Sequence, residues 1–214
     1  MASMSAIPLF PLRSVLFPGG LLALRIFEPR YLDLIQRCEK NGEPFGVVLL
    51  TQGGEVRRRD KAGGGEGFEQ ERFEALGTLA QLERVERPQP GLLQIRCRGG
   101  RRFRLARSTC LPHGLWMGEG ELLAADAAVP VPEDLLPAQR LLQIFLHQLE
   151  QGASAEEMPL QPPYLWDDCA WLANRWCELL PLPSQEKQRL MALENPLLRL
   201  ELVADQLERL GVKP

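Results

Sequence analysis

The stretch from Ile7 to Leu50 constrains the fold most strongly, because it alternates short apolar runs with proline and glycine. A first run, Ile7 to Phe10, is accompanied by prolines and predicts a short, edge-like strand. The segment Phe17-Pro18-Gly19-Gly20 predicts a turn, since proline fixes φ and glycine permits positive φ. The apolar runs Leu21 to Ile26 and Phe45 to Leu50 predict two buried strands.

A single helix is predicted between the last two of these strands, and it begins near Pro29. One apolar face, at the i, i+3, i+4 and i+7 spacing, is formed by Tyr31, Leu34, Ile35 and Cys38. Asn41-Gly42 ends the helix, because glycine readily takes the left-handed conformation that often follows a helix.

Strand patterns resume after residues 51–71, which are rich in glycine and charge and predict a loop. The four further predicted strands are Phe73 to Val85, Leu92 to Arg98, Arg102 to Arg107 and Leu115 to Leu123. We therefore expect a sheet that closes on itself, or nearly so.

The two arginine-rich strands are predicted to form a hairpin. Their apolar alternation favours Cys97 opposite Phe103, across a three-residue loop at Gly99-Gly100-Arg101. This register puts Arg96 opposite Arg104 and Arg98 opposite Arg102. Because like charges repel across strands, acids must come from elsewhere, and the best placed are Glu119 and Glu121.

Helical patterns replace strand patterns after Ala124. Prolines separate four predicted helices, which cover residues 135–149, 164–180, 184–193 and 196–210. The interpretation is a β-rich subdomain, residues 1–124, followed by a helical subdomain, residues 125–214. Residues 1–120 carry 18 Lys and Arg against 13 Asp and Glu, and residues 121–214 carry 7 against 15, as is typical of two units that attract each other.

Motifs along nearly the whole chain resemble the N-terminal substrate-binding domain of Lon proteases. They are the opening run, FEALGTLAQLERV at 73–85, GLLQIRCRGGRRFRL at 91–105, GLWMGEGELL at 114–123 and the helical segment 169–210. The resemblance implies an α+β fold, in which a PUA-like β pseudo-barrel with one or more short helices precedes a C-terminal helical bundle.

The resemblance also implies recognition of unfolded or damaged protein segments and a contribution to oligomer contacts. The ATPase and the peptidase of a full Lon protease have no counterpart in this sequence. We therefore expect a non-enzymatic protein-binding or peptide-binding module that acts as an adaptor, and we leave homo-oligomer formation open.

Apolar residues at the turns near Pro18 and Pro29 fit either a core or an exposed surface for unfolded segments. We expect most of them in the core and a few at the surface. The candidate peptide-binding residues are Phe17, Pro18, Phe27 and Tyr31.

The alternative function is RNA binding by a PUA-like protein through an Arg-rich surface. Its candidate residues are Arg57, Arg58, Arg59, Arg96, Arg98, Arg102 and Arg104. A pI near 5.6 and the acids interspersed among these arginines argue against it. Nucleic acid is therefore the less favoured partner.

No catalytic residue, cofactor or metal site is predicted. The run Gly63-Gly64-Gly65-Glu66-Gly67 has an acid where a phosphate-binding loop needs a cation. The two histidines, His113 and His147, lie in different predicted domains, and no cysteine has a partner at metal-ligand spacing. A hydrolase would need a cleft that joins one of these histidines to a cysteine or serine and an acid.

The cysteines and the hydropathy predict the compartment. Five cysteines, an odd number without a CxxC pair, and the absence of a signal-peptide pattern favour a reducing, cytoplasmic setting. No apolar stretch reaches the roughly 18 residues of a membrane span, so we expect no membrane partner.

Overall fold

The computed structural model describes residues 2–56, 70–152, 154 and 158–212. The chain divides into two compact units, residues 1–124 (unit 1) and residues 125–214 (unit 2). In the described residues, unit 1 holds a six-stranded sheet with one α-helix, and unit 2 holds four α-helices. The expected α+β composition is therefore confirmed, whereas the division into two subdomains stays a prediction.

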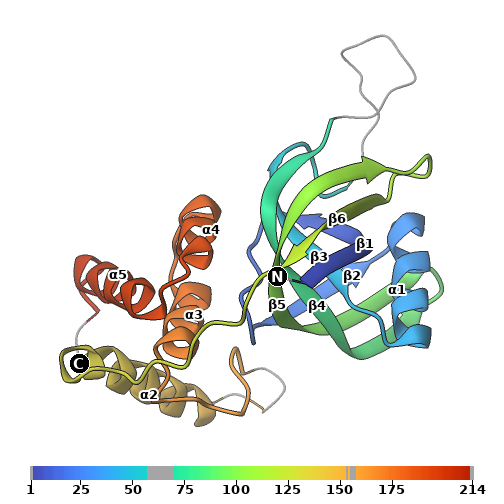
Figure 1. The fold of residues 1–214 in the computed structure, drawn as a ribbon. Coiled ribbons are helices and arrows are strands. Elements are labelled where there is room, and N and C mark those ends of the chain that lie inside the picture. Colours follow the sequence, from blue (N-terminus) through green and yellow to red (C-terminus); the bar gives the residue numbers. More distant parts are fainter. Residues whose placement is uncertain (1, 57–69, 153, 155–157, 213–214) are drawn as a thin grey trace. The chain divides into compact units, whose positions relative to one another are not determined.

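The sheet of unit 1 closes on itself. Its strands are β1 (Ala2–Leu12), β2 (Leu21–Ile26), β3 (Phe45–Gln52), β4 (Arg72–Gln89), β5 (Leu92–Cys110) and β6 (Trp116–Leu122) (Figure 1). They pair in the order β2-β5-β4-β3-β1-β6, and β6 also pairs with β5. β1 runs parallel to β3, and every other pair is antiparallel. The sequence thus predicted β2 with its correct bounds.

β1 is not the edge strand that its prolines predicted, because it lies between β3 and β6. Its two halves use different neighbours. Leu9 to Leu12 pair with β3, whereas Ala2 to Leu9 pair with β6. Pro8 is therefore paired only toward β6 and Pro11 only toward β3, which leaves each proline an unpaired side where no N–H donor is needed.

The predicted hairpin at Gly99-Gly100-Arg101 is wrong, because β5 continues through it from Leu92 to Cys110. The glycines serve a close approach of two backbones instead. Gly99 N donates to Gly20 O at 2.8 Å, and Gly19 N donates to Gly99 O at 2.7 Å. A Cβ at position 99 would lie 2.1 Å from the Phe17 carbonyl oxygen, so only glycine fits where the turn at Phe17 to Gly20 crosses β5.

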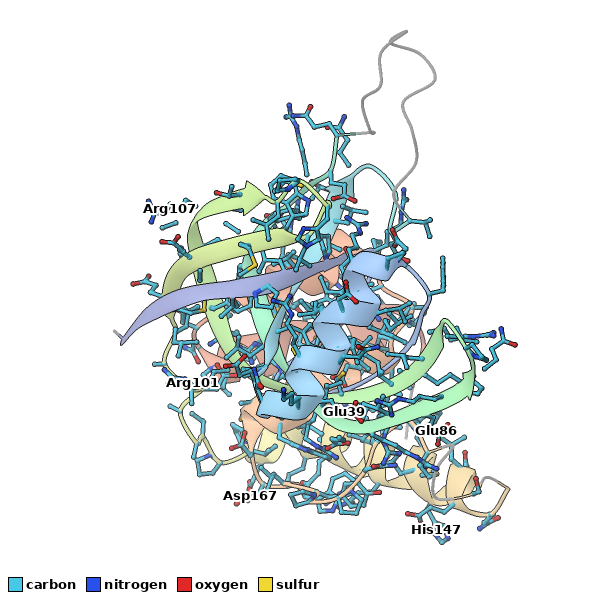
Figure 2. All side chains as sticks on the ribbon, turned by 90° about the vertical axis from the view of Figure 1, so that its right-hand side faces the viewer. Glu39, Glu86, Arg101, Arg107, His147 and Asp167 are labelled. Atoms are coloured by element: carbon cyan, nitrogen blue, oxygen red, sulfur yellow. The ribbon has the colours of Figure 1, made fainter. Side chains whose placement is uncertain are left out.

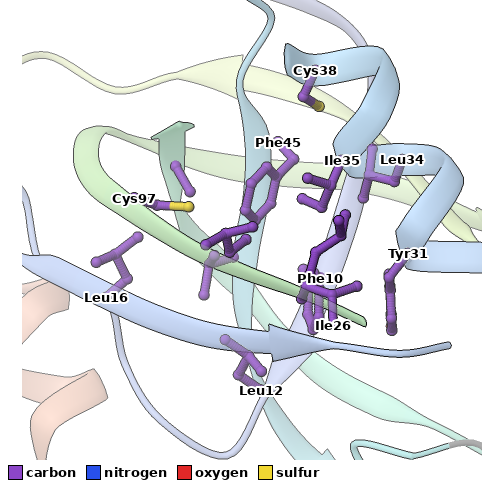
Figure 3. Packing of buried hydrophobic residues seen from close by; sticks show 14 of the residues in the cluster. Phe10, Leu12, Leu16, Ile26, Tyr31, Leu34, Ile35, Cys38, Phe45 and Cys97 are labelled. Atoms are coloured by element: carbon purple, nitrogen blue, oxygen red, sulfur yellow. The ribbon is translucent and has the colours of Figure 1, made fainter. Parts of the chain in front are cut away.

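The predicted helix is confirmed as α1 (Pro29–Asn41), which ends at Gly42 with φ 70°. Its apolar face points into the core of unit 1 (Figure 3). The buried residues of this face are Tyr31, Leu34, Ile35 and Cys38. The Tyr31 ring stacks on Phe10 of β1, with ring centroids 3.9 Å apart, so the helix is anchored to the sheet through aromatic packing as well as aliphatic burial.

Unit 2 begins with a 3-10 turn, η1 (Glu133–Leu135). Its α-helices are α2 (Leu136–Glu150), α3 (Cys169–Leu179), α4 (Ser184–Ala192) and α5 (Pro196–Arg209). α3 starts later than residue 164, where the sequence predicted its start. Asp168 caps it, because Asp168 Oδ1 accepts a hydrogen bond from Trp171 N at 2.9 Å. None of the helices in the described ranges is long and apolar enough to cross a membrane.

Candidate functional site

The end strand of the sheet offers the backbone of the candidate site. In the described part of the chain, β2 pairs along one edge only, with β5, from Leu21 opposite Arg98 to Ile26 opposite Leu93. Every second residue of such a strand directs its N–H and C=O away from its neighbour. An extended polypeptide can add to these groups as a further strand.

A small hollow of about 100 Å³ adjoins β2. β2 and the residue after it contribute Leu24, Ile26 and Phe27 to its lining. The other lining residues are the apolar Phe10, Leu12, Tyr31 and Val56 and the charged Arg25, Glu28 and Glu55. Phe27 and Val56 are its exposed hydrophobic members, with 55% and 41% of their surface accessible. We call β2, Phe27, Val56 and this hollow the β2 edge site.

Arg13 positions the segment that carries Val56. Its backbone N–H donates to Glu55 Oε1 at 2.6 Å, and its guanidinium Nη2 donates to Gly53 O at 2.9 Å. Both bonds connect the residue after β1 to the chain that follows β3. Val56 is therefore held beside the hollow by contacts of the residues just before it, of which Glu55 also lines the hollow.

A buried ionic cluster supports the other side of the site, at the start of α1. Arg30 donates from Nη1 to Gly114 O at 2.7 Å and forms ion pairs with Glu28 at 3.3 Å and Glu71 at 3.2 Å. Glu71 also accepts from Trp116 Nε1 at 2.5 Å. These contacts tie the helix start to β6 and to the beginning of β4, so the chain around Phe27 has a fixed support.

Tyr31 contributes a buried aromatic ring to the hollow. Burial raises the pKa of Tyr31 well above its ordinary value of 10.0, and the nearby Arg30 guanidinium only partly offsets that increase. The hydroxyl therefore stays protonated at neutral pH. The hollow presents an apolar floor to a ligand.

The four predicted peptide-binding residues occupy two separate places. Phe27 and Tyr31 both line the hollow, with Phe27 exposed and Tyr31 buried beneath it. Phe17 is fully buried, and Pro18 is half-buried in the turn that crosses β5. Val56 was missed, since it lies in an aperiodic segment that gives no sequence signal.

The predicted basic surface is divided among acids. Arg96 and Arg98 both pair with Glu83, at 3.5 and 2.5 Å. The predicted register had assigned them to Glu119 and Glu121, and it is wrong because β4, not the second half of β5, lies beside them. The turn between Gln89 and Leu92 makes β4 the antiparallel neighbour of β5. This turn was the sequence signal that could have placed Glu83 beside the two arginines.

The remaining arginines do not gather into one patch. Arg102 is buried, and the exposed Arg104 lies opposite Glu121 in the β5–β6 register. Arg101 and Arg107 lie apart along β5 (Figure 2), with Arg101 bonded to Leu123 O and Arg107 paired with Glu119. Arg57, Arg58 and Arg59 fall outside the described residues. The described arginines therefore do not favour RNA binding.

The histidines lie in surroundings that do not resemble a hydrolase centre. His147 lies on α2 beside Glu150 and Gln151, and it is exposed (Figure 2). His113 lines a surface hollow with side chains of α1, namely Asp33, Gln36, Arg37 and Lys40. No group of three or more potential metal ligands occurs in the part of the chain that the structure describes.

Comparisons with known proteins agree with this fold. A family model described as the ATP-dependent protease La (LON) substrate-binding domain matches residues 6–209. A Lon N-terminal domain protein from Xanthomonas campestris is 31% identical over 99% of this chain and 100% of that chain, with a TM-score of 0.67. The N-terminal domain of the Mycobacterium avium complex Lon protease shares the fold at 17% identity, with a TM-score of 0.57 over 94% of this chain and 97% of that one. Comparison with curated proteins gives no significant match. Since the family model spans nearly all residues, the chain belongs to the LON substrate-binding domain family.

Proposed function

We propose that this protein binds unfolded or extended protein segments at the β2 edge site and has no enzymatic activity of its own. The observation that carries the proposal is the second edge of β2, which pairs with no strand among the described residues, beside the exposed Phe27 and Val56. In this proposal unit 1 is a PUA-like pseudo-barrel that presents the edge, and unit 2 is a helical bundle. The family's description as a substrate-binding domain supports the same function.

The site suits partners of varied sequence. Backbone groups of an added strand supply hydrogen bonds that do not depend on side chains, each with a net contribution of about 0.5–1.5 kcal/mol. Apolar side chains of the partner then cover Phe27 and Val56, and the hydrophobic contribution is about 25 cal/mol per Å² of apolar surface removed from water. A native protein keeps most of its strands paired and most of its large apolar side chains buried, so it should bind far more weakly.

The test is binding of the purified protein to labelled polypeptides that are held unfolded by reduction and alkylation, with their native forms as controls. Phe27→Ser and Val56→Ser should each weaken binding. Leu198→Ser is the matched control, because Leu198 is 41% exposed but lies on α5. Equal, negligible affinity for unfolded and native polypeptides would overturn the proposal.

A second measurement tests the backbone contribution. Peptides N-methylated at alternate residues lose the donors on one edge, so one of the two alternating series should bind more weakly than the unmethylated peptide. Equal affinity for the unmethylated peptide and both series would show that no strand is added.

An adaptor role and a reducing compartment, such as the cytoplasm, belong to the same proposal. All five cysteines are free thiols, which supports a reducing environment. The non-enzymatic part is checked by incubating an unfolded polypeptide with the protein, with and without ATP. Cleavage that copurifies with the wild-type protein would contradict it.

A further inference from the structure

Unit 2 contains a groove of about 480 Å³ that the proposed function does not use. The groove lies between the start of α2 and the end of α5, and its volume is within the about 300–1,000 Å³ of typical ligand sites. Leu135, Ala138 and Leu207 are its buried floor, and its sides include Leu141, Ala204 and Val212. An apolar side chain placed there would lose its contact with water on several sides.

Two carboxylates border this apolar surface. Asp134, on η1, and Glu208, on α5, line the groove and are exposed. Within the described ranges, neither carboxylate has an ion-pair partner. Unit 2 as a whole carries 14 Asp and Glu against 7 Lys and Arg. The groove therefore combines an apolar floor with negative charge at its border.

We propose that this groove docks a polypeptide segment in which large apolar side chains are flanked by lysine or arginine. The apolar side chains would fill the floor, and the flanking cations would face Asp134 and Glu208. Charge complementarity selects this partner over a neutral or acidic apolar segment, because an acidic segment would meet repulsion at the border. The proposal does not rest on the β2 edge site, since its residues all belong to unit 2.

The experiment uses the full chain and a labelled peptide with the core Phe-Leu-Leu flanked by two lysines at each end. Fluorescence anisotropy compares it with the same core flanked by glutamates. The lysine peptide should bind at least about tenfold more tightly, and its affinity should fall as salt is raised, because exposed charges are screened.

Charge reversal then locates the binding. The double variant D134K/E208K should weaken the lysine peptide by about tenfold or more, whereas Asp205→Lys should change its affinity by less than about twofold. Asp205 is the matched control, because it is an exposed acid on the same helix that does not line the groove. Glu208→Gln, a milder change, should weaken the lysine peptide in the same direction and decides the result if the double variant does not fold.

Three results would overturn the proposal. One is equal affinity for the lysine and glutamate peptides. Another is binding that survives the changes at Asp134 and Glu208 but is lost in Phe27→Ser, which would place the peptide at the β2 edge site. The third is dimerisation of the chain, measured by sedimentation, that these groove variants abolish, because a second copy would then be the occupant.

Discussion

Arg199 and Asp126 form a bidentate ion pair within unit 2, with Nη1–Oδ2 at 2.7 Å and Nη2–Oδ1 at 3.2 Å. Arg199 is 1% exposed. Its guanidinium also donates to the Leu190 and Leu193 carbonyls, at the end of α4, and to Asn174 Oδ1 on α3. The buried Arg199 side chain of α5 thereby supplies hydrogen bonds to the carbonyls at the end of α4 and connects α4 to α3.

Replacing Arg199 with methionine should destabilise unit 2 strongly. The methionine fills much of the space but removes the ion pair with Asp126 and the hydrogen bonds to the helix-end carbonyls, and breaking a buried pair in this way costs about 3–5 kcal/mol. Urea unfolding followed by circular dichroism measures the loss. Arg189→Met removes an exposed ion pair with Glu186 and should cost less than about 1 kcal/mol. Similar losses in the two variants would contradict this account of Arg199.

Gly99→Ala should destabilise unit 1, whereas Gly100→Ala should be nearly neutral. A Cβ at 99 would lie 2.1 Å from Phe17 O, so the turn must move and its bonds to β5 weaken. A Cβ at 100 meets nothing closer than Leu79 O at 3.4 Å, which is ordinary contact. Thermal unfolding of both variants gives the comparison. If the neighbouring substitutions lower Tm equally, the close approach at Gly99 is not what requires glycine.

The local elements of this fold were predictable because each has its own signal. α1 combines helical spacing of apolar residues with Pro29 at its start and Gly42 at its end. β2 is an apolar run that directly follows a proline and glycine turn. In both cases neighbours in the sequence determine the conformation, so a sequence pattern is sufficient.

The register of β5 was not predictable from the same kind of pattern. Gly99 and Gly100 indicated a turn, but Gly99 instead bonds to the Phe17–Gly20 turn, which is about 80 residues earlier in the chain. Glycine permits a turn and also permits close packing of two backbones, and its local sequence does not distinguish these cases. The partners of Arg96 and Arg98 depended on that choice and were misassigned with it, whereas Glu121 does lie opposite Arg104.

The candidate site was found only in part for a related reason. Phe27 and Tyr31 stood out as large apolar residues beside Pro29, but only the fold shows that one is exposed and the other buried. Val56 belongs to an irregular segment whose position depends on Arg13, through contacts that no periodicity records. That β2 has a single neighbour in the described sheet follows from the pairing of all six strands.

One cysteine should react much faster than the others in the native protein. Cys110 is exposed, whereas Cys38, Cys97, Cys169 and Cys177 are buried. Burial also raises the pKa of the Cys177 thiol from 9.0 to about 12, which suppresses the reactive thiolate. A disulfide reagent such as DTNB at neutral pH should therefore titrate one thiol quickly and all five only after denaturation.

Cys110→Ser serves as the control for this thiol titration and should abolish the fast phase. A fast phase that persists in this variant would show that one of the buried cysteines is accessible. The titration must be done below the unfolding temperature, because all thiols react in the unfolded chain.

Cys97 should make the protein less stable as the solution becomes alkaline. Burial raises the pKa of the Cys97 thiol from 9.0 to about 12, and the neighbouring Cys38 adds to the effect. Between these values the unfolded chain has lost the proton that the folded chain keeps. The free energy of unfolding must then fall as pH rises, and the stabilisation from Cys97 is fully present only below the unfolded pKa.

Cys97→Ala removes the titrating group, and its cavity adds a cost that does not depend on pH. Urea unfolding from about pH 8 to about pH 11 should therefore give a shallower decline for Cys97→Ala than for the wild type. Parallel declines would mean that the folded protein releases this proton as readily as the unfolded chain.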